Sequence, residues 1–121
     1  MTKIIRFEDL ECWQQARALV KEIYKVTKRK EFSKDFRLVG QIQGSAISVM
    51  ANISEGFIRK SDKEFIQFLF IALSSAAEVQ SHLYVALDQD YIAESEFHSM
   101  YILTERTAKM ISGLIKYLRK K

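Results

Sequence analysis

Two pairs of polar residues have the spacing that brings side chains together on one face of a helix. Asn52 precedes Glu55 by three residues, and Ser75 precedes Glu78 by three. Residues three apart on a helix are neighbours, so each pair can act as a unit. Glu78 lies in a small, apolar segment, where an unpaired carboxylate would be costly. The pairs indicate either a contact site near the turn between two helices or, as we favour, a buried polar network that fixes helix register.

The other reactive side chains form no catalytic or metal-binding pattern. His82 and His98 are expected on different helices, and neither belongs to an HxxxH or ExxH pair. Cys12 is the single cysteine, so a CxxC-type zinc site has no second ligand. The sequence contains no P-loop, no GxGxxG turn and no GxSxG elbow. We therefore expect no enzymatic activity and no cofactor, and tight stoichiometric metal in the purified protein would revive the enzyme hypothesis.

Basic residues recur at helical spacing in two places and could neutralise phosphates. The first set is Arg17, Lys21, Lys25 and Lys28, and the second is Arg106, Lys109, Lys116, Lys120 and Lys121. The alternative is that these are ordinary solvated faces, since helix C-termini favour cations. No RNA-binding motif accompanies them, and no exposed aromatic platform can be argued from the sequence. The candidate nucleic-acid contacts are Arg17, Lys21, Lys25, Arg59, Lys109 and Lys116.

Apolar residues at three- and four-residue steps predict four helices that would position these groups. The expected ranges are residues 10–30, 36–58, 61–89 and 94–121, with a polar connection over residues 28–35. Asp9 is the expected N-cap of the first helix, and Ser61 with Glu64 forms a capping box for the third. Short links make neighbouring helices antiparallel. The predicted fold is an all-α, antiparallel, up-down four-helix bundle with one domain, residues 1–121.

The composition is that of a soluble domain built from long helices. Of 121 residues, 48% are hydrophobic and 28% charged, and there is no proline, which helix interiors exclude. Gly40 and Gly44 indicate close approach of a neighbouring helix, while Gly56 is expected to loosen a helix end. No run is long enough to span a membrane, and no signal peptide is visible. With the single cysteine, this favours a cytoplasmic location.

The third predicted helix is apolar on nearly every side over residues 65–73, FIQFLFIAL. A helix that is apolar all round is buried all round, so the surplus predicts a homo-oligomer. The alternative is a wide core face with a few exposed aromatic residues. The candidate oligomer interface consists of Ile66, Phe70, Leu73, Tyr84, Leu114 and Tyr117.

Residues 41–78, QIQGSAISVMANISEGFIRKSDKEFIQFLFIALSSAAE, resemble the central segment of the 23S rRNA-intervening-sequence proteins, also called the four-helix bundle protein family. The resemblance extends to FEDLECWQQA near the start and ISGLIKYLRK near the end. It implies a homo-oligomer, with a five-subunit ring as the expected form. Family members are often encoded inside insertions in bacterial 23S rRNA genes. A related accessory protein of diversity-generating retroelements is a pentameric, basic bundle that partners a reverse transcriptase and nucleic acid.

The sequence also departs from the family pattern. Gln43 and Gly44 stand where the family usually has two arginines, and Met50 stands where proline is common. The loss of two cations weakens any nucleic-acid contact on that face and favours the basic stripes of the first and fourth helices. Our leading hypothesis is an oligomeric bundle that binds structured RNA through phosphate contacts. The alternative is a protein-assembly scaffold or an accessory subunit of another polypeptide, such as a retroelement reverse transcriptase.

Overall fold

In the computed structural model, which describes residues 4–121, every regular element is a helix. The elements are a 3-10 turn η1 (Phe7–Asp9), α1 (Glu11–Thr27), the short α2 (Lys30–Ser33), α3 (Phe36–Phe57), α4 (Asp62–Asp88) and α5 (Glu94–Lys120). The prediction of an all-helical chain with four long helices is therefore confirmed. The long helices begin and end within three residues of the predicted positions.

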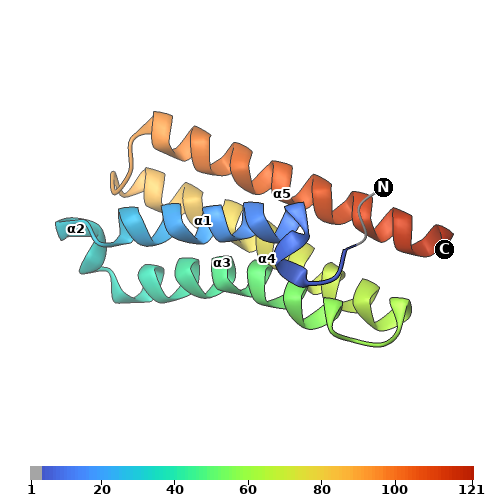
Figure 1. Cartoon of the computed structure of the whole chain (residues 1–121). Helices are drawn as coiled ribbons and strands as arrows, with labels where there is room; N and C mark the ends of the chain where they lie inside the picture. The colour runs from blue at the N-terminus through green and yellow to red at the C-terminus, as the bar shows by residue number, and fades with distance from the viewer. Residues whose placement is uncertain (1–3) are drawn as a thin grey trace.

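The four long helices lie alongside one another and enclose a shared core (Figure 1). Each packs against two others, in the order α1, α3, α4, α5 and back to α1. The link between α3 and α4 lies at one end of the bundle, and the link between α4 and α5 lies at the other (Figure 1). The C-terminal end of α5 is on the same end as the link between α3 and α4 (Figure 1).

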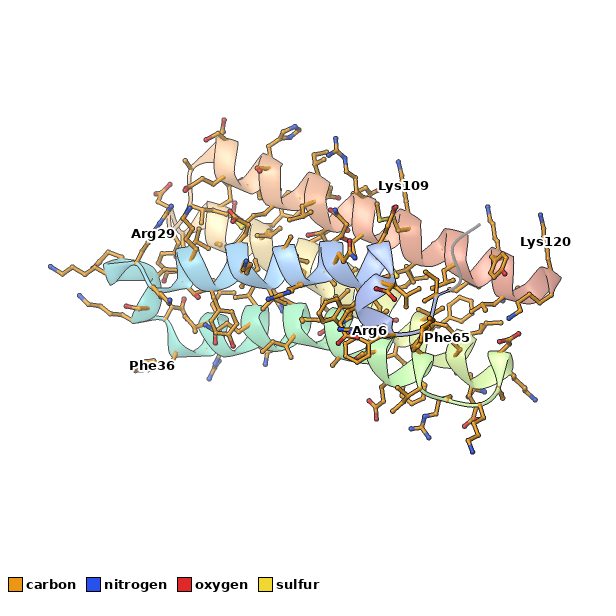
Figure 2. The ribbon with its side chains drawn as sticks, in the orientation of Figure 1. Arg6, Arg29, Phe36, Phe65, Lys109 and Lys120 are labelled. Atoms are coloured by element: carbon orange, nitrogen blue, oxygen red, sulfur yellow. The ribbon has the colours of Figure 1, made fainter. Side chains whose placement is uncertain are left out.

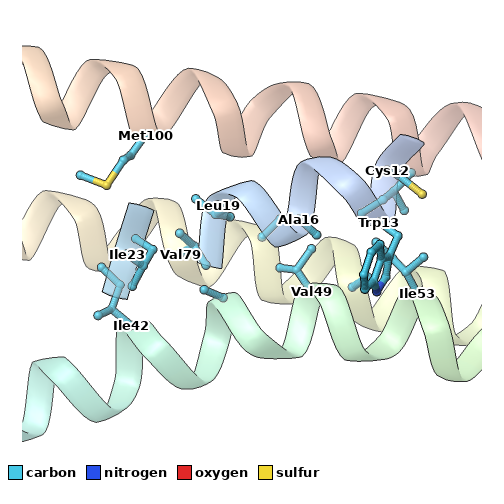
Figure 3. Packing of buried hydrophobic residues seen from close by; sticks show 14 of the residues in the cluster. Cys12, Trp13, Ala16, Leu19, Ile23, Ile42, Val49, Ile53, Val79 and Met100 are labelled. Carbon is cyan, nitrogen blue, oxygen red and sulfur yellow. The ribbon is translucent and has the colours of Figure 1, made fainter. Parts of the chain in front are cut away.

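The core takes one stripe of large aliphatic residues from each long helix (Figure 3). Its fully buried members include Leu19, Ile23, Ile42, Val49, Ile53, Leu69, Val79, Leu83 and Ile111. Buried threonines return their hydroxyls to the backbone one turn earlier, as Thr104 does to the Met100 carbonyl at 2.7 Å. Among the described residues, no buried side-chain nitrogen or oxygen lacks a hydrogen-bond partner. The core is therefore apolar and its few polar groups are satisfied.

Side-chain caps fix the starts of two helices. The Leu38 amide donates to Asp35 Oδ1 at 3.0 Å, and the Glu64 amide donates to Ser61 Oγ at 3.0 Å. The second of these is one of the two bonds of the predicted capping box, and it starts α4 at Asp62. The prediction that Asp9 caps α1 is wrong. Asp9 ends η1, and Leu10 occupies the cap position of α1 without a side-chain bond.

The predicted polar connection over residues 28–35 contains the short helix α2. Phe32 within it is only 1% exposed, and its ring stacks on Tyr91 at a centroid distance of 4.8 Å. The Tyr91 hydroxyl in turn donates to Asp35 Oδ2 at 2.9 Å. One aromatic residue in a charged stretch thus ties the connection to the link between α4 and α5.

The glycines behave differently from the prediction. No side chain or neighbouring helix lies within 4 Å of the position where a Cβ on Gly40 or Gly44 would stand, so neither glycine serves a close approach within the chain. Gly56 is the close contact instead. A Cβ there would meet the Cβ of Phe68 at 2.8 Å and the ring of Phe65 at 2.9 Å. Gly56 therefore lets α3 and α4 approach each other rather than loosening the end of α3.

This contact predicts that Gly56→Ala destabilises the fold. The added methyl must displace Phe65 or the backbone of α4 at Phe68, and overpacking of this kind costs about 1–3 kcal/mol. Gly113→Ala is the matched control, because that position faces open space and alanine favours the helix by about 1 kcal/mol. Urea unfolding measures both variants, and equal stabilisation by the two substitutions would contradict the close contact.

Candidate nucleic-acid interface

The second half of α5, with Lys121 after it, has a larger positive charge than the chain as a whole. From Arg106 to Lys121 there are six cationic residues and no acidic residue. The net charge of the whole chain is +4, so all other residues together sum to −2. A single helical segment is therefore the main source of positive potential.

These cations lie on the side of α5 that faces solvent. Arg106, Lys109, Lys116 and Lys120 are exposed and follow one another with Gly113 at three- and four-residue steps, which defines one face of the helix. We call this set, with Gly113, the α5 stripe. Lys109 and Lys120 project away from the bundle (Figure 2). At 1.5 Å per residue the stripe extends over about 21 Å.

Helix periodicity explains why the stripe is exposed. The buried residues of α5, which include Thr104, Ile111 and Leu118, take the opposite side and pack into the core. Arg119 and Lys120 lie in the last turn, where cations interact favourably with the free carbonyl groups of the helix end. The stripe is thus compatible with a stable helix, and its exposure agrees with the sequence prediction for Lys109 and Lys116.

The basic residues of α1 are exposed as well, but they are less isolated from acidic groups. Arg17 and Lys21 line an open groove of about 870 Å³ beside η1, together with Arg6 and Glu8. Arg6 pairs with Glu8 at 3.3 Å. Sequence analysis missed Arg6 because it precedes η1, in an extended stretch without helical periodicity. The exposed Lys25 lies farther along α1.

A cleft lies between α1 and the start of α5. It has a volume of about 230 Å³ and is lined by Glu22, Lys25, Arg29 and Glu96, among others. Arg29 Nη1 donates to Glu96 Oε1 at 2.9 Å, and its other terminal nitrogen pairs with Glu96 Oε2. The Ala93 amide also donates to Glu96. These bonds, that of Arg29 first, lower the pKa of Glu96 to about 2. Arg29 therefore connects the segment after α1 to the first turn of α5 through Glu96.

Arg59 belongs to neither α1 nor α5 but to the link between α3 and α4. Its guanidinium stands 4.8 Å from the centroid of the Phe68 ring and pairs with Glu55 at 3.8 Å. Of the six predicted contacts, Arg59 is the one that an ion pair already engages. None of the other five takes part in an ion pair with the residues that the structure describes.

The predicted polar network forms with a different membership. Asn52 Nδ2 donates to the Ser48 carbonyl at 2.8 Å and to Ser48 Oγ at 2.9 Å, and Ser75 Oγ donates to Ser48 Oγ at 2.8 Å. Ser48 is therefore the centre of a bridge between α3 and α4. Glu55 and Glu78 are exposed and lie outside it. The prediction that Glu78 needs buried partners is wrong, because its side of α4 faces solvent.

The six predicted interface residues divide into two groups. Ile66, Leu73 and Leu114 are half-buried and pack against the chain's own core. Phe70, Tyr84 and Tyr117 are 45%, 51% and 54% exposed, respectively. Each of these three rings has a partner within the chain. Arg119 lies 5.4 Å from Phe70, Lys121 lies 5.9 Å from Tyr117, and Phe97 lies 4.8 Å from Tyr84.

A second exposed surface was not predicted, and it lies along α3. Phe36, Ile47 and Ile58 are 84%, 42% and 68% exposed. Gly40, Gly44 and Ala51 are exposed at intervening helical positions. We call these six residues the α3 face. From Leu38 to Ser54 the chain has no charged residue, which is unusual for a helix that faces solvent.

The described residues show no grouping of three or more His, Cys, Asp or Glu side chains that could hold a metal ion. Cys12 is buried, and burial raises the pKa of its thiol to about 11, so the thiol stays protonated at neutral pH. Nδ1 of His82 lies 3.3 Å from Ser45 Oγ, and His98 is on another helix. Within residues 4–121, no helix has an apolar stretch of the length that a membrane span needs.

The geometry defines a class of small helical bundle with one basic face and one uncharged face. The chain belongs to the 23S rRNA-intervening sequence protein family, whose profile matches residues 8–113. A solved structure, a protein of unknown function from the S23 ribosomal protein family of Bacteroides thetaiotaomicron, is similar with a TM-score of 0.79 and 27% identity. The similarity covers 87% of this chain and 98% of the other. No curated protein matches this sequence.

The bond between Arg29 and Glu96 predicts an acid-dependent loss of stability. The folded pKa of Glu96, about 2, lies below the ordinary value of 4.5. The bond therefore contributes stability above about pH 5, and this contribution disappears as the pH falls toward 2. Because the side chains of Arg29 and Glu96 are 44% and 32% exposed, solvent screening limits it to about 1 kcal/mol or less.

Urea unfolding of the native chain and of Glu96→Gln between pH 7 and pH 2.5 measures this contribution. The difference in unfolding free energy should be largest at pH 7 and shrink as the pH is lowered. Glu94→Gln, an exposed position in the same first turn, is the control because it removes a carboxylate and leaves the bond between Arg29 and Glu96 in place. A difference for Glu96→Gln that stays constant over this range would contradict the assignment.

Proposed function

We propose that this antiparallel, up-down four-helix bundle is a non-enzymatic, cytoplasmic, oligomeric protein that binds structured RNA through phosphate contacts. The observation that supports the proposal most directly is the α5 stripe. It is exposed over its whole length and has no acidic residue beside it in the sequence from Arg106 onward. The family to which the chain belongs is named for an insertion in 23S rRNA, which favours RNA over other polyanions.

The chemistry of the stripe favours affinity over sequence recognition. Lysine ammonium groups on flexible stems attract phosphates as point charges, without the planar fork that reads base edges. Phosphate contacts position a nucleic acid but carry no sequence information directly. Arg17, Lys21 and Lys25 on α1 form the second, weaker contact set, because Glu22 on the same helix lies close to Lys25 in the cleft toward α5.

Two double variants test this proposal by comparing the contributions of α5 and α1 to RNA binding. Lys109→Ala with Lys116→Ala removes two cations from α5, and Lys21→Ala with Lys25→Ala removes two from α1. Both lower the net charge by the same amount, so a general charge effect would weaken RNA binding equally. We expect the α5 variant to lose more affinity and to reduce the slope of log K against log salt by about 1.4–1.8, since each phosphate contact contributes about 0.7–0.9.

The measurement is fluorescence anisotropy with a transcript of the 23S rRNA insertion and an unrelated structured RNA, from low to near-physiological salt. Similar affinities for the two transcripts would agree with phosphate-led binding. Tighter binding to the transcript of the 23S rRNA insertion would show specificity in addition to phosphate-led binding. Lack of binding to either RNA at low salt by the folded protein would refute the RNA proposal.

The α3 face supports the proposal that copies of the chain associate, with a five-subunit ring as the expected form. Its glycines and Ala51 make a smooth surface, which suits the close approach of another helix. Phe36, Ile47 and Ile58 add exposed apolar area. Phe70, Tyr84 and Tyr117 are weaker candidates for the contact, because each ring already meets a cation or another ring of its own chain.

Ile47→Glu should dissociate the oligomer, because the carboxylate would have to lose its hydration in an apolar contact. Val85→Glu on α4 is the matched control, since Val85 is 43% exposed and Ile47 is 42% exposed. Sedimentation equilibrium gives the mass of each variant, and circular dichroism verifies that both remain folded. If Val85→Glu dissociates the oligomer and Ile47→Glu does not, the contact lies elsewhere than on the α3 face.

The second candidate function is that of an assembly scaffold for another polypeptide, and the α3 face is the observation that favours it. An uncharged, partly apolar helix face is also what a helix of a different protein would cover. The two functions differ in their response to substitution. A scaffold should lose function with Ile47→Glu while it tolerates the loss of Lys109 and Lys116.

A further inference from the structure

Two exposed aromatic rings flank the basic end of α5. Phe70 belongs to α4 and Tyr117 to α5, and they are 45% and 54% exposed. The two helices meet at this end of the bundle, where Lys121 pairs with Asp62 at 3.6 Å. Figure 1 shows the end of α5 and the start of α4 at the same end of the bundle. The end that carries most of the positive charge thus also presents aromatic surface.

Each ring has a cation beside it. The Arg119 guanidinium lies 5.4 Å from the centroid of Phe70, and the Lys121 ammonium lies 5.9 Å from that of Tyr117. About half of each side chain nevertheless remains open to solvent. Aromatic rings interleaved with cations are the surface that binds single strands, because bases stack on the rings while cations follow the backbone.

We infer that the α5 stripe takes a single-stranded segment of RNA, with unpaired bases stacked on Phe70 and Tyr117. This inference rests on the proposed RNA-binding function and names the form of RNA that the site prefers. In a duplex the faces of the bases are covered by their neighbours, so exposed rings add nothing to its binding. Loops, bulges and ends offer free base faces.

The middle of the stripe suits the same ligand. Gly113 lies between Lys109 and Lys116, is exposed, and has no side chain or neighbouring element within 4 Å of the position where a Cβ would stand. A glycine in a helix interior costs about 1 kcal/mol relative to alanine, and packing inside the chain does not explain it here. Its absent side chain lets a sugar–phosphate backbone approach the helix between two lysines.

The charge of the stripe argues against a second copy of the chain as the occupant. Two α5 stripes that met would bring like charges together without an acidic residue of the segment Arg106–Lys121 to compensate them. The α3 face has no such penalty, since it contains no charged residue between Leu38 and Ser54. Self-association therefore fits α3, and a polyanion fits α5.

The test compares a single-stranded RNA of twelve nucleotides with a blunt duplex of the same sequence, by fluorescence anisotropy at one fixed salt concentration. Tyr117→Ala and Phe70→Ala should each weaken binding of the single strand by about 5- to 150-fold, the range found for loss of one stacked base. Binding of the duplex should change less than twofold. Tyr117→Phe, which keeps the ring, should bind like the native protein.

Tyr84→Ala is the matched control. Tyr84 is 51% exposed, close to the value for Tyr117, but it packs on Phe97 at the start of α5, away from the stripe. This variant should leave single-strand binding unchanged. Phe70→Leu and Tyr117→Leu keep apolar bulk without a ring, so they preserve the test if an alanine variant fails to fold. They should show the same selective loss.

Three results would overturn the inference. One is equal loss of single-strand and duplex binding in the ring variants, and another is no loss in either. The third is dissociation of the oligomer by Phe70→Leu or Tyr117→Leu, which would make the rings a subunit contact. In all three cases, RNA binding by the native protein that depends on Lys109 and Lys116 would leave the proposed function intact. If the native folded protein binds neither RNA at low salt, the proposed function itself fails.

Discussion

A helix can give only one of its sides to a shared core, and the surfaces of this bundle follow from that constraint. Each long helix delivers one stripe of buried residues, such as Ile23 from α1, Ile42 from α3 and Leu83 from α4. The side opposite each stripe must face solvent or another molecule. On α1 and α5 that side is charged, as solvent requires. On α3 the exposed side has no charge between Leu38 and Ser54, whereas a helix side that faces solvent ordinarily carries charged residues.

Local sequence rules predicted the parts of the fold that depend on one helix at a time. The apolar period gave the four long helices, and Ser61 gave the start of α4, because a cap involves only residues within one turn. The same rules failed where the answer depends on a neighbour. Gly44 and Gly56 are both glycines in α3, yet only Gly56 faces Phe68 of α4. Periodicity shows which side of a helix is buried but not which residue stands opposite at a given height.

The candidate site shows the same limit. Lys109 and Lys116 could be predicted as exposed because they lie opposite the buried stripe of α5. The position of Arg119 over the Phe70 ring could not, since it joins residues of two helices that are far apart in sequence. Glu78 was expected to be buried because its sequence neighbours are small and apolar, although its own side of α4 faces solvent. In each case the missing information was the rotation of one helix relative to the next.

The departure of this chain from its family pattern gains a physical meaning from the structure. Gln43 and Gly44, the two positions at which the resemblance implies arginines, both fall in the uncharged segment of α3. Gln43 Nε2 donates to Thr27 Oγ1 of α1 at 3.0 Å, and Gly44 is exposed beside Ile47. An arginine at position 44 would place a hydrated charge in the middle of the α3 face and oppose any apolar contact there. Without it, positive charge is concentrated on α5, and the two faces are chemically distinct. The two proposed contacts, self-association through α3 and a polyanion on α5, would therefore use separate faces and would not compete.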